Sequence, residues 1–234
     1  MSADLNAVTM LGQMALALAL PVAVFTVAAL ALGLRRQALA KAGSLRLAAA
    51  GGEGLDGVLP GTNLVRAGMR SVGVLLGLVA VAIGCLWYAF MTNDFAIQYV
   101  ADHSARDLPA FYKFTALWGG NEGSLLFWCF ILCIWMFVAS RSRDPEAAPI
   151  VPYATAILAG VAIFFLYILN TVAQPIVAQA IVPANGSGLD TLLQDPYMAI
   201  HPPMLYTGFV GFTVPFAFAM GALLSKSRGW PGSV

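Results

Sequence analysis

The sequence predicts an all-α polytopic membrane protein. Of its 234 residues, 60% are hydrophobic and 10% are charged, whereas soluble domains carry about 45–50% apolar and about 25% charged residues. The apolar residues gather in five runs, each near the roughly 20 residues that a helix needs to cross a bilayer. The 12 basic and 11 acidic residues nearly cancel, so no nucleic-acid partner is expected. The partner implied by composition is the lipid bilayer.

The five predicted spans form a single membrane domain over residues 1–234. The first is expected to remain in the protein, because Asp4 precedes it where a cleaved signal peptide would carry basic residues. Pro21 is tolerated inside that span and is predicted to kink it. The expected segments are spans at about 8–34, 71–91, 123–140, 151–170 and 204–224, a glycine-rich cytoplasmic linker at 35–70, and outer loops at 92–122 and 171–203.

The basic residues predict the orientation of the chain. Cytoplasmic loops accumulate Lys and Arg, and only Arg106 and Lys113 lie between the second and third spans. The N-terminus is therefore predicted outside and the C-terminus in the cytoplasm. The remaining ten basic residues fall on the predicted cytoplasmic side: Arg35, Arg36, Lys41, Arg46, Arg66, Arg70, Arg141, Arg143, Lys226 and Arg228.

The predicted spans lack the residues that mark an ion pathway. None of them holds Asp, Glu, Lys, Arg or His, whereas transporters and proton pumps keep such residues in the membrane for function. Cys85, Cys129 and Cys133 lie in apolar runs without CxxC spacing, so they are interpreted as apolar filler. A transporter or channel subunit is therefore the least favoured function.

The outer loop between the second and third spans alternates aromatic and charged residues, which predicts an interfacial helix. It ends in Trp118-Gly119-Gly120-Asn121-Glu122-Gly123-Ser124. Asn121 suits a helix N-cap and Glu122 suits the first turn. The glycines permit a close backbone approach, and Trp118 and Trp128 flank them. This segment suits either packing or the docking of a flat apolar ligand or a partner helix.

The second outer loop leads to a histidine at the predicted mouth of the fifth span. Asp195-Pro196 favours a turn, and Pro202-Pro203 suits the first turn of a helix. His201 is then either an interfacial hydrogen-bonding group or an axial haem iron ligand. His103, the other histidine, stands in a polar stretch and is expected to be solvated.

In order and spacing, these motifs resemble the N-terminal part of the CcmF/NrfE haem lyase subunits (the CcmF/CycK/CcsA family). The resemblance covers nearly the whole chain apart from the glycine-rich linker. Its motifs are Asn93-Asp94-Phe95, Tyr99-Val100-Ala101, Leu108-Pro109, Tyr112, Trp118-Gly119, Glu122-Gly123-Ser124, Leu192-Leu193-Gln194-Asp195-Pro196, His201-Pro202-Pro203 and Leu205-Tyr206.

The resemblance implies a bacterial inner-membrane subunit that helps attach haem to CxxCH motifs of apocytochrome c outside the membrane. His201 matches the first of two outer histidines that hold the haem iron, a b-type haem on its way to c-type. Trp118, Gly119, Gly120 and Glu122 would shape the outer surface where haem or a partner docks. Asn121 stands where family members often have His, so no ligand role is expected for that loop.

The tryptophan-rich WWD segment, the second outer histidine and the membrane histidines of the family have no counterpart in this sequence. The resemblance therefore implies part of a haem lyase, incomplete on its own and sharing haem with a WWD-bearing C-terminal part or second subunit. A haem chaperone, apocytochrome c and its thiol-reducing subunit are the other implied partners. The alternative is a non-catalytic scaffold that assembles with the WWD-bearing part without touching haem.

Overall fold

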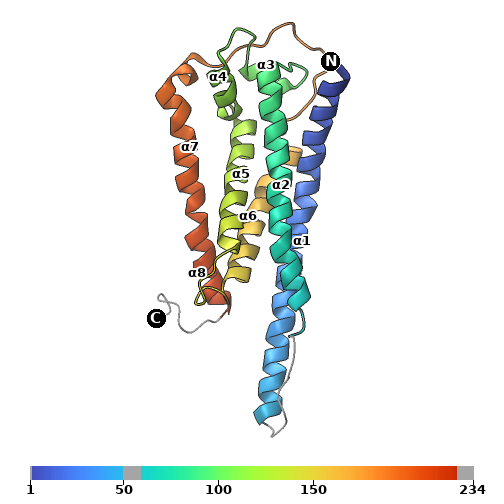
Figure 1. Ribbon diagram of the computed structural model, residues 1–234, viewed down its shortest axis with the longest axis vertical. Helices are drawn as coiled ribbons and strands as arrows, with labels where there is room; N and C mark the ends of the chain where they lie inside the picture. Colours follow the sequence, from blue (N-terminus) through green and yellow to red (C-terminus); the bar gives the residue numbers. More distant parts are fainter. Residues whose placement is uncertain (1, 50–58, 226–234) are drawn as a thin grey trace.

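A computed structural model describes residues 2–49 and 59–225, and those residues form an α-helical bundle (Figure 1). Within them the only β-type contact is an isolated bridge between Ile97 and Ala178. Five candidate spans are long and apolar enough to cross a membrane, which confirms the predicted all-α polytopic class. The helices that supply them are α1 (Ser2–Ala49), α2 (Thr62–Thr92), α5 (Asn121–Ser140), α6 (Val151–Thr171), and α7 (Pro196–Gly211) together with α8 (Thr213–Ser225).

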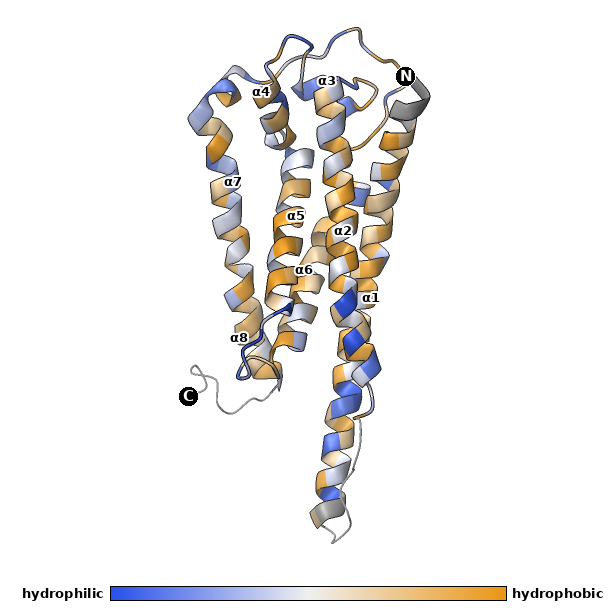
Figure 2. Ribbon diagram, in the orientation of Figure 1, coloured by the Kyte–Doolittle hydropathy of each residue, from blue (hydrophilic) through white to orange (hydrophobic). Residues whose placement is uncertain are grey.

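The core runs along α2, which packs against α1 on one side and α5 on the other. Leu75, Val79 and Leu86 are fully buried at helical spacing on one face of α2. A buried hydrogen bond of 2.8 Å between the hydroxyls of Thr26 and Ser71 joins α1 to α2. Figure 2 shows the bundle as mostly hydrophobic, with the hydrophilic residues concentrated at its two ends and along the lower part of α1.

The first two helices extend into the predicted linker. Helix α1 continues past Leu34 to Ala49, because residues 35–49 are rich in Ala and Leu, which favour helix. Helix α2 begins at Thr62, directly after Gly61 with φ 91°. Gly51, Gly52, Gly54 and Gly57 of the linker, and the tail residues Lys226 and Arg228, lie outside the described residues.

The fifth span begins earlier than predicted. Helix α7 starts at Pro196, because the Asp195 carboxylate caps it by accepting hydrogen bonds from the amides of Tyr197 (2.8 Å) and Met198 (3.3 Å). Pro202 and Pro203 therefore lie inside the helix rather than in its first turn. Only 17% of this span's most apolar window is buried, against 39–44% for the other four.

The loop between α2 and α5 holds the predicted helical structure as three short elements. They are α3 (Gln98–His103), α4 (Ala110–Thr115) and the 3₁₀ turn η1 (Ala116–Trp118). Tyr99 and Val100 of α3 are buried against the end of the bundle. The segment from Val172 to Asp195, with the 3₁₀ turn η2 (Thr191–Gln194), crosses the same end and leads into α7.

Candidate functional site

The buried hydroxyl of Tyr99 organises the glycine-rich loop at this end. It donates to Leu117 O (2.9 Å) and accepts from the Gly120 amide (2.9 Å). A side chain at Gly123 would collide with Leu117 O and with the Tyr99 ring, so only glycine fits there. Burial, with a smaller contribution from Glu122, raises the pKa of the Tyr99 hydroxyl well above its usual value.

The close approach predicted for Gly119 and Gly120 is made to side chains of this same chain. A Cβ on Gly119 would lie 2.9 Å from Leu189 Cδ1, and one on Gly120 would meet the His103 ring. Gly120, in extended conformation, is the N-cap of α5, so Asn121 is the first helical residue and not the cap. Glu122 is in the first turn as expected, and it is half-buried.

Trp118 is a buried packing residue. Its side chain is 8% exposed and stacks on Phe127 with ring centroids 5.1 Å apart. Its Nε1 donates a hydrogen bond of 3.1 Å to Ala199 O in α7. The ring therefore does not form the exposed outer surface expected for it, because Phe127 and α7 cover it.

The Trp118–Ala199 hydrogen bond replaces one that the helix cannot make. In an α-helix the carbonyl of Ala199 would accept from the amide of residue 203, but Pro203 has no N–H. Ala199 is 3% exposed, so water is not a ready substitute. Trp118 Nε1 thus supplies Ala199 O with the donor that Pro203 lacks.

His201 lies two residues beyond Ala199 in α7, and its side chain is exposed. The Asp195 cap fixes the start of the helix, and the Trp118 bond fixes its second turn. The structure therefore presents the imidazole from an anchored helical segment at the end of the bundle that carries α3 and α4.

His103 is half-buried, so the solvated environment expected for it is wrong. Its ring lies 4.3 Å from that of Tyr99, and its Nδ1 is 3.0 Å from Tyr99 O. A carbonyl only accepts, so Nδ1 carries the proton and Nε2 of the neutral ring carries the lone pair. The ring lines a polar cavity of about 340 Å³ with Asp102 and Glu122. The polar sequence around His103 gave no sign of its contact with Gly120.

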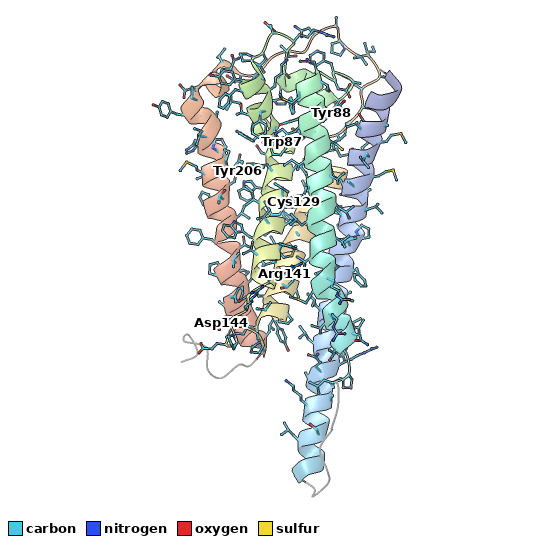
Figure 3. The ribbon with its side chains drawn as sticks, viewed as in Figure 1. Trp87, Tyr88, Cys129, Arg141, Asp144 and Tyr206 are labelled. Atoms are coloured by element: carbon cyan, nitrogen blue, oxygen red, sulfur yellow. The ribbon has the colours of Figure 1, made fainter. Side chains whose placement is uncertain are left out.

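Sequence reasoning also missed the part that Tyr206 plays in the site. Its hydroxyl donates to Ser124 Oγ (3.3 Å), which in turn donates to Trp118 O (3.1 Å). Its ring makes edge contacts with Phe127 and Trp128, with centroids 6.2 and 5.6 Å apart. Tyr206 is labelled in Figure 3, between α7 and α5. Tyr206 therefore links α7 to the start of α5 through its side chain.

Few side chains at the His201 end of the bundle could coordinate iron. Among residues 2–49 and 59–225, no group of three or more His, Cys, Asp or Glu side chains could hold a metal ion. His103 Nε2 faces Gly120, which leaves no room for a flat macrocycle. Of the two histidines, only His201 offers an exposed imidazole, which fits a single axial ligand and not a complete haem site.

The fold and this site define a multi-pass, all-α membrane protein whose loops and one exposed histidine are organised at one end of the bundle. Residues 118–230 match the family model described as cytochrome C assembly protein. The chain is 45% identical over 144 residues to the cytochrome c-type biogenesis protein CcmF of Pseudomonas fluorescens, over 61% of this chain and 22% of that one.

Two further relatives from cytochrome c biogenesis are similar to this chain. NrfE of Haemophilus influenzae is 38% identical, over 64% of this chain and 25% of its own length. CcmF of Escherichia coli is 39% identical, over 73% of this chain and 27% of its own length. These matches confirm the resemblance predicted from the motifs: the chain is similar to CcmF-type proteins. The matched segments span about a quarter of these relatives.

A solved structure of the cytochrome c haem lyase CcmF has the same fold. It superposes on 94% of this chain with a TM-score of 0.68 and 24% sequence identity. The superposed part is 31% of that longer chain. At this identity the likeness supports the helical arrangement alone.

Proposed function

We propose that this chain takes part in cytochrome c maturation as part of a haem lyase, with His201 as an axial ligand to the haem that is delivered to apocytochrome c. The observation that carries the proposal is the anchored, exposed imidazole. His201 stands on a helix whose start is capped by Asp195 and whose next turn is held by Trp118. The relatives named for cytochrome c biogenesis support the part in cytochrome c maturation.

In this role the chain supplies one face of a haem site. Haem is the substrate, and its vinyl groups form thioethers with the two thiols of a CxxCH motif. His201 would fix the iron, while Trp118, Gly119, Gly120 and Glu122 hold the helix and loop around it in place. Trp118 acts from the interior through its bond to Ala199 O, and Glu122 contributes the half-buried edge of the polar cavity.

The complete reaction needs groups that this chain does not offer. One exposed histidine leaves the second axial position of the iron open, so a WWD-bearing part or second subunit is the expected partner. A haem chaperone would supply haem, and a thiol-reducing subunit would keep the apocytochrome cysteines reduced. The chain is therefore proposed to be an incomplete enzyme that works in an assembly.

The proposed location is the bacterial inner membrane, with the His201 end outside. Basic residues gather at the opposite end of the bundle, on α1, the start of α2 and the loop after α5, as the positive-inside rule requires of a cytoplasmic end. Labelling of single introduced cysteines by an impermeant maleimide tests this. A cysteine at Asn185 should react in intact spheroplasts, and one at Ser142 should react only after lysis.

Substitution of His201 tests the proposal directly. His201→Ala, co-produced with the WWD-bearing part, should abolish holocytochrome c and change the optical spectrum of the purified complex. Met204→Ala is the matched control, because Met204 lies one turn further along the same helix and is 70% exposed. Normal holocytochrome with His201→Ala would rule out the ligand assignment.

The alternative is a scaffold that assembles with the WWD-bearing part without touching haem. The sparse burial of the fifth span favours it, because that span leaves most of its surface free for another helix. A scaffold predicts that the complex forms and that its haem spectrum is unaffected by His201→Ala. A transporter or channel subunit remains the least favoured function.

A further inference from the structure

The opposite end of the bundle carries a groove between α1, α6 and α8, away from His201, Trp118 and Tyr206. It consists of two adjoining cavities of about 420 Å³ and about 250 Å³, which share Leu34, Ala38 and Tyr153 in their walls. The larger one is lined mainly by apolar side chains, including Val27 and Ile157. Small residues on α1 and α6 create the space: Ala31, Ala38 and Ala156.

Polar groups gather where the groove leaves the apolar part of the bundle. Arg35 lines the larger cavity, Lys41 lines the smaller one, and Tyr153 lines both. Within the described ranges, neither cation is paired with a carboxylate, and the Tyr153 hydroxyl has no hydrogen-bond partner. The acidic residues of the nearby α5–α6 loop, Asp144 and Glu146, are exposed, and the same loop carries two cations, Arg141 and Arg143.

The depth of Arg35 in the membrane follows from the length of α1. The candidate span begins at Ala7, and a helical rise of about 1.5 Å per residue places Arg35 about 42 Å further along. A bilayer with its headgroup regions is about 40–45 Å thick. Arg35 therefore lies at headgroup level, while the apolar part of the groove toward Val27 lies at the depth of the acyl chains.

We propose that this groove is a binding site for an anionic phospholipid, with an acyl chain between α1 and α6 and the phosphate beside Arg35, Lys41 and Tyr153. The change from apolar walls to unpaired cations along one groove matches the two ends of such a lipid. Basic pockets between helices on the cytoplasmic side suit anionic headgroups. An anionic lipid compensates one of the two positive charges of the groove, whereas a zwitterionic lipid, which has no net charge, leaves both uncompensated.

The test uses the purified full chain in nanodiscs made from equal amounts of phosphatidylglycerol and phosphatidylethanolamine. Native mass spectrometry then measures the lipids that stay bound. Wild type should retain phosphatidylglycerol in preference. Arg35→Gln and Lys41→Gln should each reduce that preference about fivefold, the effect of one basic residue near an anionic membrane surface.

Two further variants separate a built site from general attraction. Arg46→Gln removes an exposed cation from the same helix outside the groove and should leave the preference unchanged. Ala156→Phe fills the apolar part without changing charge and should reduce retention of either lipid. An equal effect of Arg46→Gln, an unchanged preference in both Arg35→Gln and Lys41→Gln, or retention of a second copy of the chain in place of lipid would overturn the proposal.

Discussion

Trp118→Phe should loosen the start of α7 by removing one hydrogen bond while keeping an aromatic ring at the position. The variant leaves Ala199 O without a donor, because Pro203 cannot supply one. An unsatisfied buried carbonyl costs about 1–3 kcal/mol. Since about 1.4 kcal/mol is tenfold in an equilibrium constant, amide hydrogen exchange in residues 197–201 should accelerate by about tenfold.

The proline offers a way to restore the bond. Pro203→Ala returns a backbone N–H at the position from which a helix normally donates to Ala199 O. In that background Trp118→Phe should cost much less, so the double-mutant cycle should show a coupling of about 1–2 kcal/mol. The double variant should exchange more slowly than the sum of the single effects predicts.

Hydrogen exchange monitored by mass spectrometry in nanodiscs measures the local opening free energy for all four proteins. Trp87→Phe is the control for loss of an indole, because Trp87 Nε1 donates to Phe114 O and not to α7. It should leave the α7 peptides unchanged. Additivity of the two substitutions within about 0.5 kcal/mol would show that Trp118 does not compensate for the missing N–H of Pro203.

Three other predictions concern the same end of the bundle. Gly123→Ala should lower the thermal stability by about 1–3 kcal/mol through overpacking against Leu117 O, whereas Gly160→Ala, with open space around it, should not. Asp195→Ala should remove the cap of α7 and cost about 0.5–2 kcal/mol, read from the same α7 peptides. The raised pKa of Tyr99 means that the folded state holds this proton more tightly than the unfolded state, so stability should be retained below about pH 10 and should fall as the pH rises further. Tyr99→Phe should remove that loss when melting is compared at pH 9 and pH 11.

The membrane spans could be predicted from the amino-acid composition. Long apolar runs identify spans because a helix satisfies its own backbone in lipid, and all five were found from the sequence. The ends of the helices were less predictable. Helix α1 continues through Arg35 and Lys41, since a helix that leaves the membrane needs no change in its backbone. Helix α7 starts at Pro196, directly after its Asp195 cap, because the capping carboxylate outweighs the effect of the two prolines further on.

Properties of the site that depend on the type of residue could be predicted from the sequence. Properties that depend on contacts between distant segments could not. The exposure of His201 on α7 agrees with its place beside the proline pair. The burial of Trp118 and the position of His103 beside Gly120 depend on segments far apart in the chain meeting at one end. No local sequence pattern carries that information. The glycines therefore predicted that the backbone is closely approached, but not which side chains approach it.

The two ends of α7 differ in how the carbonyl groups left without an amide donor by proline are satisfied. At its N-terminal end an indole satisfies the carbonyl that Pro203 leaves without an amide donor. At the other end Pro215 likewise denies Gly211 O its usual donor, and Trp135 lies close by, with its Nε1 3.8 Å from where a Gly211 Cβ would be. Yet that buried Nε1 has no hydrogen-bond partner among the described residues. The position of His201 is therefore determined by the loop that carries Trp118, and the break at Phe212 leaves α8 free to follow α6 without disturbing it.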